Sequence, residues 1–368
     1  MSVDDRDMPP PSVEDPTDAG QIDADPFSAA RLQAITTQEA IQQMTGADMR
    51  LHALKAFVHL GIADSLDDDE FRTSDELAEI CQADPQMMAR FLYAMHAHGV
   101  LTTDEHGRYG LTPLGQALRS GAAMWAALGV ITSPLWQQAG DHLTATICTG
   151  HPHTLNGEET PYPLLAAHPG LATKFDMFMS SRTTGLAAAL ATRNFAGFRT
   201  VADLGGGDGT LLAAILTSHP HLDGILIERP DVAARAEHHL AGQGLAGRVE
   251  IIAGDIFDDL CPPADLIIVS SILHNRDDPA NLRLLGNARQ SLEKAGPHAE
   301  LWAVEVPLPE PGFHNHGIDL DLRMMSLFAG GRERTLPQYQ TLLAQAGLDL
   351  INVVPLPGSH DLMIAMAD

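Results

Sequence analysis

The sequence predicts an α/β protein in which a Rossmann-like domain with a seven-stranded sheet follows a helical, winged-helix-like domain. Three observations support this fold class. An apolar strand near 200–204 leads into a glycine-rich turn and then into an apolar helix. From Thr200 onward, apolar strands alternate with helical patterns, which is typical of a mostly parallel sheet. Before Thr200, helical patterns precede a hairpin signal, which is the element order of a winged helix.

Composition divides the 368 residues into three segments. Residues 1–26 contain eight acidic residues, one arginine and five prolines, so they have little apolar surface to bury and are expected to form a disordered tail. Residues 27–194 are expected to form the helical domain together with linker helices. Residues 195–368 are expected to form the Rossmann-like domain.

The helical domain opens with apolar residues at helical spacing between Ala34 and Leu66, which predict two helices with Gly46 or Gly61 near an end. Its later elements are predicted from capping and turn signals: helix starts at Thr73-Ser74, Asp84-Pro85 and Thr112-Pro113, a hairpin around 104–107, and largely helical chain from Gly121 to Asn194.

The Rossmann-like domain is predicted from alternating apolar strands and helices. Strands are expected near 200–204, 224–228, 248–252, 264–270, 299–306, 350–354 and 361–366, and helices near 209–218, 230–241, 279–294 and 335–346.

The net charge of −26 argues against nucleic acid as a partner, because an acidic surface repels a polyanion. The helix expected from Pro85 to His98, which would enter a DNA groove, contains one arginine and no lysine. Three widely spaced cysteines favour a reducing compartment, and no metal motif is expected, His151-Pro152-His153 included. Neither a signal peptide nor an apolar run of roughly 18 residues is visible, so we expect a cytoplasmic protein without membrane contact.

Three successive strand ends offer the parts of an adenosine site. Glycines 205, 207 and 209 permit a sharp turn whose backbone can approach a ligand. Glu228 ends the next strand and suits the two hydroxyls of a ribose. Asp255 follows the third strand beside Ile256-Phe257, which suits the amino group and the face of an adenine. An ordinary tight turn would not explain this ordered set.

Four motifs together resemble those of the S-adenosylmethionine-dependent small-molecule O-methyltransferases, especially the bacterial members that tailor polyketides and other aromatic natural products. They are Asp203–Gly209, Gly254–Phe257, Leu273-His274 and Gly330–Thr335. The resemblance implies S-adenosyl-L-methionine as cofactor, S-adenosyl-L-homocysteine as product, an antiparallel last strand, a small-molecule substrate and a homodimer formed through the N-terminal helices. It implies cofactor contacts from Asp203, Gly205, Gly207, Glu228, Arg229, Asp255, Ile256, Phe257, Ser270 and Ser180.

His274 is the candidate general base, because it follows the carboxyl end of a parallel strand and titrates near neutrality. Glu305, near the end of the next strand, can fix its tautomer, and Glu333 matches the second carboxylate that the family places beside the base. Both could instead be ordinary ion-pair partners. The resemblance and the methionine-rich pattern predict substrate contacts from Phe175, Met179, Asn275, Asp321, Met324, Met325 and Phe328.

The chain departs from the family pattern around the expected base. It has His274-Asn275-Arg276 where the family commonly has His-Asp-Trp, Glu228-Arg229 in place of Asp and an apolar residue, and Ser270 in place of Lys. Some relatives bind the cofactor yet catalyse decarboxylation, hydroxylation or pericyclic ring formation. A non-methylating enzyme therefore stays open as an alternative, and a ligand-sensing winged-helix regulator is opposed by the acidic charge.

Overall fold

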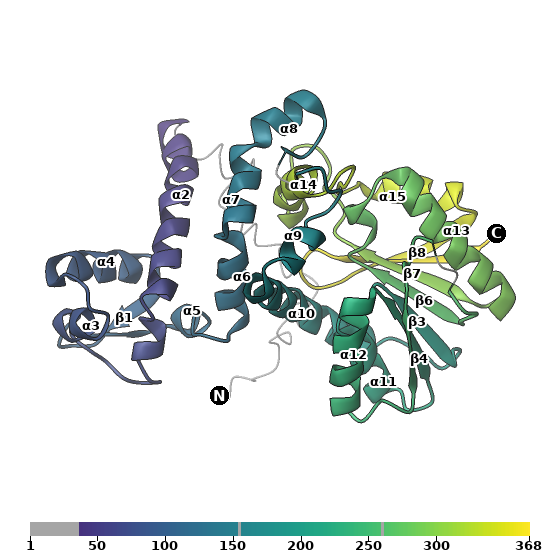
Figure 1. Cartoon of the computed structure of the whole chain (residues 1–368), viewed down its shortest axis with the longest axis horizontal. Helices are drawn as coiled ribbons and strands as arrows, with labels where there is room; N and C mark the ends of the chain where they lie inside the picture. Colours follow the sequence, from purple (N-terminus) through teal and green to yellow (C-terminus); the bar gives the residue numbers. More distant parts are fainter. Residues whose placement is uncertain (1–36, 154–155, 259–260) are drawn as a thin grey trace, which may run out of the picture.

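A computed structural model describes residues 37–153, 156–258 and 261–368. The predicted acidic tail, residues 1–26, lies outside these ranges, as does the start of the expected helical domain. The described chain has a helical N-terminal part on one side and an α/β part on the other (Figure 1). No helix in the described ranges is long and apolar enough to cross a membrane.

The first helix, α2 (Thr37–His59), runs unbroken through Gly46, so Gly46 does not end a helix, whereas the alternative, a helix end near Gly61, is confirmed. One glycine costs a helix interior only about 1 kcal/mol, which the packing of a long helix offsets. Gly61 lies beyond the end of the helix with a left-handed φ of +66°. A single 3₁₀ turn, η1 (Ala63–Ser65), follows it.

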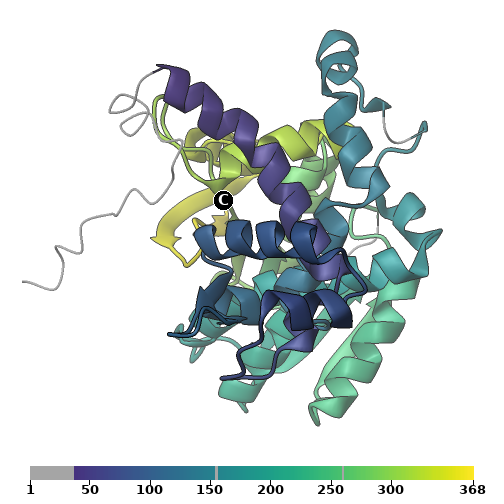
Figure 2. The ribbon, with the colours of Figure 1, turned by 90° about the vertical axis from the view of Figure 1, so that its left-hand side faces the viewer.

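The winged-helix-like elements follow in the predicted order. Helix α3 (Ser74–Ile80) begins at a capping box between Thr73 and Glu76. Helix α4 (Pro85–Ala97) begins where the Asp84 carboxylate accepts the amide proton of Met87 at 2.9 Å. Strands β1 (Leu101–Thr103) and β2 (Tyr109–Leu111) then form the predicted antiparallel hairpin. These elements make the end of the molecule that faces the viewer in Figure 2.

Between the hairpin and the sheet, the described residues form six helices, which confirms the largely helical chain predicted there: α5 (Pro113–Gln116), α6 (Ala123–Ile131), α7 (Pro134–Asp141), α8 (Leu143–Thr149), α9 (Tyr162–Ala166) and α10 (Pro169–Ala191). The last of these packs against α6 at one side and against the α/β part at the other.

The α/β part contains the predicted seven-stranded sheet, with β3 (Thr200–Leu204), β4 (Asp223–Glu228), β5 (Val249–Ala253), β6 (Leu266–Ser270), β7 (Glu300–Glu305), β8 (Leu348–Pro355) and β9 (Asp361–Ala367). The strand order is β5-β4-β3-β6-β7-β9-β8. Strands β3 to β7 are parallel, and β9 is antiparallel to both of its neighbours, as the family pattern implied.

Helices cover both faces of this sheet (Figure 1). They are α11 (Thr210–Ser218) and α12 (Pro230–Gly242) on one face, with α13 (Asp278–Ala295) and α15 (Leu336–Gln345) on the other. Two further segments follow β6 and β7: the 3₁₀ turn η3 (Leu273–Asn275) and the helix α14 (His316–Leu327). Both lie at the carboxyl ends of the parallel strands, where α/β proteins bind their ligands.

The core below α10 depends on a cluster of aromatic rings. Phe195 is fully buried, and its ring centroid lies 5.2 Å from that of Trp302 and 6.2 Å from that of Phe198. Such rings contribute through both apolar burial and edge contacts.

We expect Phe195→Ala to lower the free energy of unfolding by about 3–5 kcal/mol, because the change leaves a cavity among rings that cannot close over it. Chemical denaturation followed by circular dichroism measures this loss. Phe313→Ala is the control, since Phe313 is 71% exposed, and it should change stability by at most about 0.5 kcal/mol. Equal losses in the two variants would contradict the assignment of this core.

Candidate active site

The glycine turn after β3 has the tight geometry that the sequence predicted. Gly205 takes a φ of +71°, and a Cβ there would lie 2.6 Å from the Ile272 side chain. Gly206 has ordinary backbone angles, yet a Cβ on it would lie 2.4 Å from an oxygen of Asp203. Both positions therefore exclude larger residues, the first by conformation and contact, and the second by the buried carboxylate beneath it.

The Asp203 carboxylate is buried beneath this turn. Among the described residues, neither of its oxygens has a hydrogen-bond partner. Burial is the largest cause that raises the pKa of Asp203 to about 7, and the carboxylates of Glu228 and Asp208 contribute to this rise. A buried carboxyl group without a partner is costly unless a ligand supplies one, so Asp203 fits a place beside a cationic group.

The other strand ends place their acids around the same turn. Glu228 accepts amide protons from Gly207 at 3.2 Å and from Arg229 at 2.8 Å, and burial raises its pKa. Asp255 accepts the amide proton of Phe257 at 2.9 Å. The structure therefore brings the three predicted parts of the adenosine site to one edge of the sheet.

Helix α10 is joined to the glycine turn through Ser180, whose hydroxyl donates to Asp208 at 2.7 Å. Asp208 also accepts from the amide and the hydroxyl of Thr210. Ser180 was expected among the cofactor contacts, and here its hydroxyl is committed to a protein partner. Asp208, which sequence reasoning did not single out, is the residue that couples the helix to the turn.

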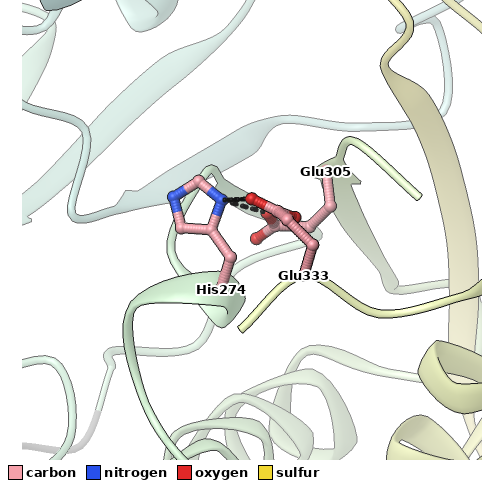
Figure 3. A group of neighbouring side chains, drawn as sticks. All are labelled: His274, Glu305 and Glu333. Carbon is pink, nitrogen blue, oxygen red and sulfur yellow. Dashed lines mark ion pairs between the residues drawn. The ribbon is translucent and has the colours of Figure 1, made fainter. Parts of the chain in front are cut away.

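His274, Glu305 and Glu333 lie together at the other end of the site (Figure 3). The Nδ1 atom of His274 is 2.8 Å from Glu333 and 3.4 Å from Glu305. Glu305 is held in turn by the amides of Ile272 and Leu273, which donate to its Oε1 at 3.0 and 2.7 Å. The second ring nitrogen of His274 points away from both carboxylates (Figure 3).

The electrostatics of this cluster favour a protonated imidazole. Burial works to lower the pKa of His274, but the two carboxylates outweigh it, so the pKa lies above its ordinary value. Burial and the carboxylate of Glu333 raise the pKa of Glu305, although the nearby imidazole opposes the rise. The three side chains also offer ligand atoms within 4.8 Å of one another, the spacing of a metal site. One Glu305 oxygen, however, already accepts two amide protons.

A buried arginine fixes the loop that carries His274. Arg334 is 1% exposed and donates to the carbonyl oxygens of Leu273 and Arg276 and to the carboxylate of Asp278. The amide of Arg332 donates to the His274 carbonyl at 2.9 Å. The Gly330–Thr335 motif predicted that this segment belongs to the site. It did not predict that Arg334 would hold the loop that carries His274.

A cavity of about 1850 Å³ joins the two ends of the site. Every predicted cofactor residue lines it, as do His274 and five of the predicted substrate residues: Phe175, Met179, Asn275, Met324 and Phe328. Glu305 and Glu333 lie behind His274 and do not reach it. Residues that the sequence analysis did not assign to the site also line the cavity, among them Arg182, Arg323, His316, His360 and Tyr162.

Asp321 and Met325, which were expected to contact substrate, do not line the cavity. The reason is the helical period of α14. Ile318, Asp321 and Met325 are spaced by three and four residues and form the stripe of the helix that faces away from the cavity. Asp321 instead accepts the amide proton of Glu333 at 2.8 Å, so it positions a residue behind the base.

Residues 143–349 match the model of an O-methyltransferase domain, and residues 43–121 match that of an O-methyltransferase dimerisation domain. The chain is 32% identical to the phenazine O-methyltransferase PhzM of Lysobacter antibioticus over 92% of its own length and 96% of that protein. It is 33% identical to the aclacinomycin 10-hydroxylase RdmB of Streptomyces purpurascens, over 74% of its own length and 75% of that protein.

Among solved structures, the chain is similar to the methyltransferase CalO1 of calicheamicin biosynthesis, in a form with S-adenosylhomocysteine bound. The TM-score is 0.77 at 27% identity, covering 92% of this chain and 99% of that one.

The raised pKa values of His274 and Glu305 give a testable dependence of stability on pH. A group whose pKa is higher in the folded state stabilises the fold at low pH, and this contribution is lost as the pH rises through the folded-state pKa. We therefore expect the unfolding temperature to fall between pH 5 and pH 8. Glu305→Gln removes one titrating group and lowers the pKa of His274, so its unfolding temperature should fall less.

Scanning calorimetry across this range measures both slopes. Glu237→Gln, which removes an exposed carboxylate from α12, is the matched control and should keep the slope of the unmodified protein. Identical slopes for the unmodified protein and Glu305→Gln would show that the buried cluster does not bind protons as described.

Proposed function

The chain belongs to the S-adenosylmethionine-dependent O-methyltransferases of natural-product tailoring, and from this membership we propose that His274 is the general base of its methyl transfer. The acceptor is a hydroxyl group on an aromatic or polyketide-type natural product. The observation that carries the proposal is the position of His274, which lines the cavity while its Nδ1 lies against two buried carboxylates.

The geometry gives each residue of the cluster a role. Glu305 and Glu333 hold the proton on Nδ1, which leaves the other ring nitrogen of His274 to accept a proton from the acceptor hydroxyl. As that proton leaves, the hydroxyl oxygen becomes the nucleophile for the methyl carbon. The two carboxylates stabilise the imidazolium that forms, in the way a buried acid supports a histidine in other general-base systems.

The acids at the strand ends fit the cofactor. When bound, S-adenosylmethionine supplies an electrophilic methyl group on a positively charged sulfonium. We expect Glu228 to accept from the ribose hydroxyls, and Asp255 with Phe257 to contact the adenine. The unpartnered Asp203 carboxylate fits the ammonium group of the methionine part. Positioning the methyl group in line with the hydroxyl supplies much of the rate enhancement.

The protein is a homodimer, and we propose residues 27–194 as its dimerisation and linker part and 195–368 as its cofactor-binding part. The match to the dimerisation domain covers α2 from residue 43 onward together with α3, α4 and the hairpin. Helix α2 also exposes large apolar side chains, with Ile41 at 56%, Met44 at 60% and Met49 at 68% exposure. An obligate interface buries such a surface.

A non-methylating reaction that retains the cofactor is the second candidate. The similarity to a 10-hydroxylase shows that relatives of this chain carry another activity. The base loop also departs from the family at Arg276, which pairs with Glu159 and lies with its guanidinium 5.4 Å from the centroid of the Phe257 ring. This arginine lines the cavity beside Phe257, the expected adenine contact.

Incubation of the protein with methyl-labelled S-adenosylmethionine and a panel of polycyclic phenols tests the methyl transfer. Under our proposal, label appears in a phenol and S-adenosylhomocysteine accumulates in equal amount. Conversion of a substrate without consumption of cofactor would replace the first candidate by the second.

His274→Ala should lower the rate of methyl transfer by roughly 10²–10⁴-fold, the usual contribution of a positioned base. Its affinity for S-adenosylhomocysteine should stay nearly unchanged, because the adenosine contacts lie on other strand ends. The rate of the unmodified protein should rise with pH through the imidazole pKa, and the variant should lose this rise. Glu305→Gln, which keeps the base but weakens its orientation, should lose less activity. A His274→Ala protein with full activity would remove the assignment.

A further inference from the structure

Two arginines in the cavity have no anionic partner. Arg182 on α10 and Arg323 on α14 both line the cavity. Neither makes a hydrogen bond or an ion pair within 4.0 Å to any residue in the described part of the chain, although Arg182 lies 5.8 Å from the Phe178 ring. The other arginines of the cavity are paired: Arg229 with Asp231, Arg235 with Asp176, and Arg276 with Glu159.

Leaving these two guanidinium groups unpaired has a physical cost. Arg182 and Arg323 are partly buried, and this partial burial disfavours the charged form and lowers the pKa of each. A partly desolvated cation gains from an anion that lies beside it. The chain has 48 acidic residues against 22 basic ones, so carboxylates are plentiful, yet none is paired with either arginine among the described residues.

The nearest acids are committed elsewhere. Asp319 lies one turn before Arg323 on the same helix and raises the pKa of Arg323 electrostatically, but it forms no ion pair with Arg323: its side chain is 67% exposed and lies 3.9 Å from His314. Glu333 influences Arg182 electrostatically but holds Nδ1 of His274 at 2.8 Å. The positive charge of the two arginines is therefore available to a ligand in the cavity.

The two arginines lie on the side of the cavity that holds the base. Both are close enough to lower the pKa of His316, whose own burial lowers it most. Arg182 also acts on His274 and His360. The acids Asp203, Asp208 and Glu228, which suit a cationic cofactor, surround the glycine turn after β3. Arg182 and Arg323 therefore add unpaired positive charge to the part of the cavity near His274.

We propose that the acceptor substrate carries a carboxylate that Arg182 and Arg323 bind while its hydroxyl faces His274. This inference rests on the proposed function, since it names the substrate class of the same site. A guanidinium presents a planar fork of N–H donors that matches a carboxylate in geometry and charge. The methionine part of the cofactor also carries a carboxylate. Measurements on protein saturated with S-adenosylhomocysteine distinguish a site for the substrate carboxylate from a site for this one.

Binding measured without turnover tests the proposal. The dimeric protein, saturated with S-adenosylhomocysteine, is titrated by calorimetry with hydroxynaphthoate and hydroxyanthraquinone carboxylates and with the carboxamide of each. We expect the carboxylates to bind roughly 10- to 100-fold more tightly than their carboxamides, the range for a hydrogen bond to a charged group. The comparison of carboxylate with carboxamide is made on the unmodified protein. The preference for the carboxylate should weaken at high salt, because salt screens the interaction between charges.

Variants assign the preference to the two arginines. Arg182→Gln and Arg323→Gln should each bring the affinities for the carboxylate and the carboxamide to within about threefold of each other. Arg323→Lys should keep part of the preference for the carboxylate, because it keeps the positive charge. Arg235→Gln is the matched control, since Arg235 lines the same cavity but is paired with Asp176. It should retain the full preference.

Three results would overturn the inference. Equal binding of carboxylate and carboxamide by the unmodified protein would show that no anion site exists. A preference that survives both glutamine variants would place the site elsewhere. Loss of S-adenosylhomocysteine affinity in these variants would assign the arginines to the cofactor. None of these readouts requires methyl transfer, so failure of the proposed reaction and failure of this inference are distinguishable.

Discussion

The site depends on burying two carboxylates beside one imidazole. Glu305 is 0% and Glu333 2% exposed, and two like charges at this depth are unfavourable unless protons and hydrogen bonds compensate them. His274 supplies the positive charge, and the backbone amides of Ile272 and Leu273 supply donors to Glu305. Because these donors belong to the residues just before His274, the cluster also fixes the loop that carries the base. The hydrogen bonds that compensate the buried charge of Glu305 are therefore the same ones that order the loop carrying His274.

Buried charges raise pKa values at two places in the cavity, and the consequences differ: His274 is a base, whereas Asp203 is an acid. At the base, carboxylates outweigh burial and raise the pKa of an imidazole, which makes it a better proton acceptor. At the glycine turn, burial and neighbouring acids raise the pKa of Asp203, because no cation in the described chain compensates its charged form. One cavity can thus hold a positively charged cofactor and a proton-accepting group without the two competing for the same counter-charge.

Local patterns explain why much of the fold could be predicted. The strands ending at Leu204, Glu228 and Ser270 are short apolar runs bounded by turn residues, and the helix start at Thr73 is a complete capping box. Tertiary placement could not be predicted in this way. Gly46 was a candidate helix end because the destabilisation of a helix by glycine can be read from the local sequence. The packing contacts that offset it come from other segments and cannot be read in this way. The hydrogen bonds of Arg334 join segments more than fifty residues apart, and which stripe of α14 faces the cavity depends on how that helix packs.

Helix α10 packs against both parts of the described chain and so couples their stability. Its 23 residues pack on α6 in the N-terminal part, on α11 beneath the sheet, and through Ser180 on the glycine turn. Leu186 and Leu190, near its end, belong to the core of the α/β part. Packing in each half therefore depends on the same helix, so we expect unfolding of one half to remove stabilising contacts from the other.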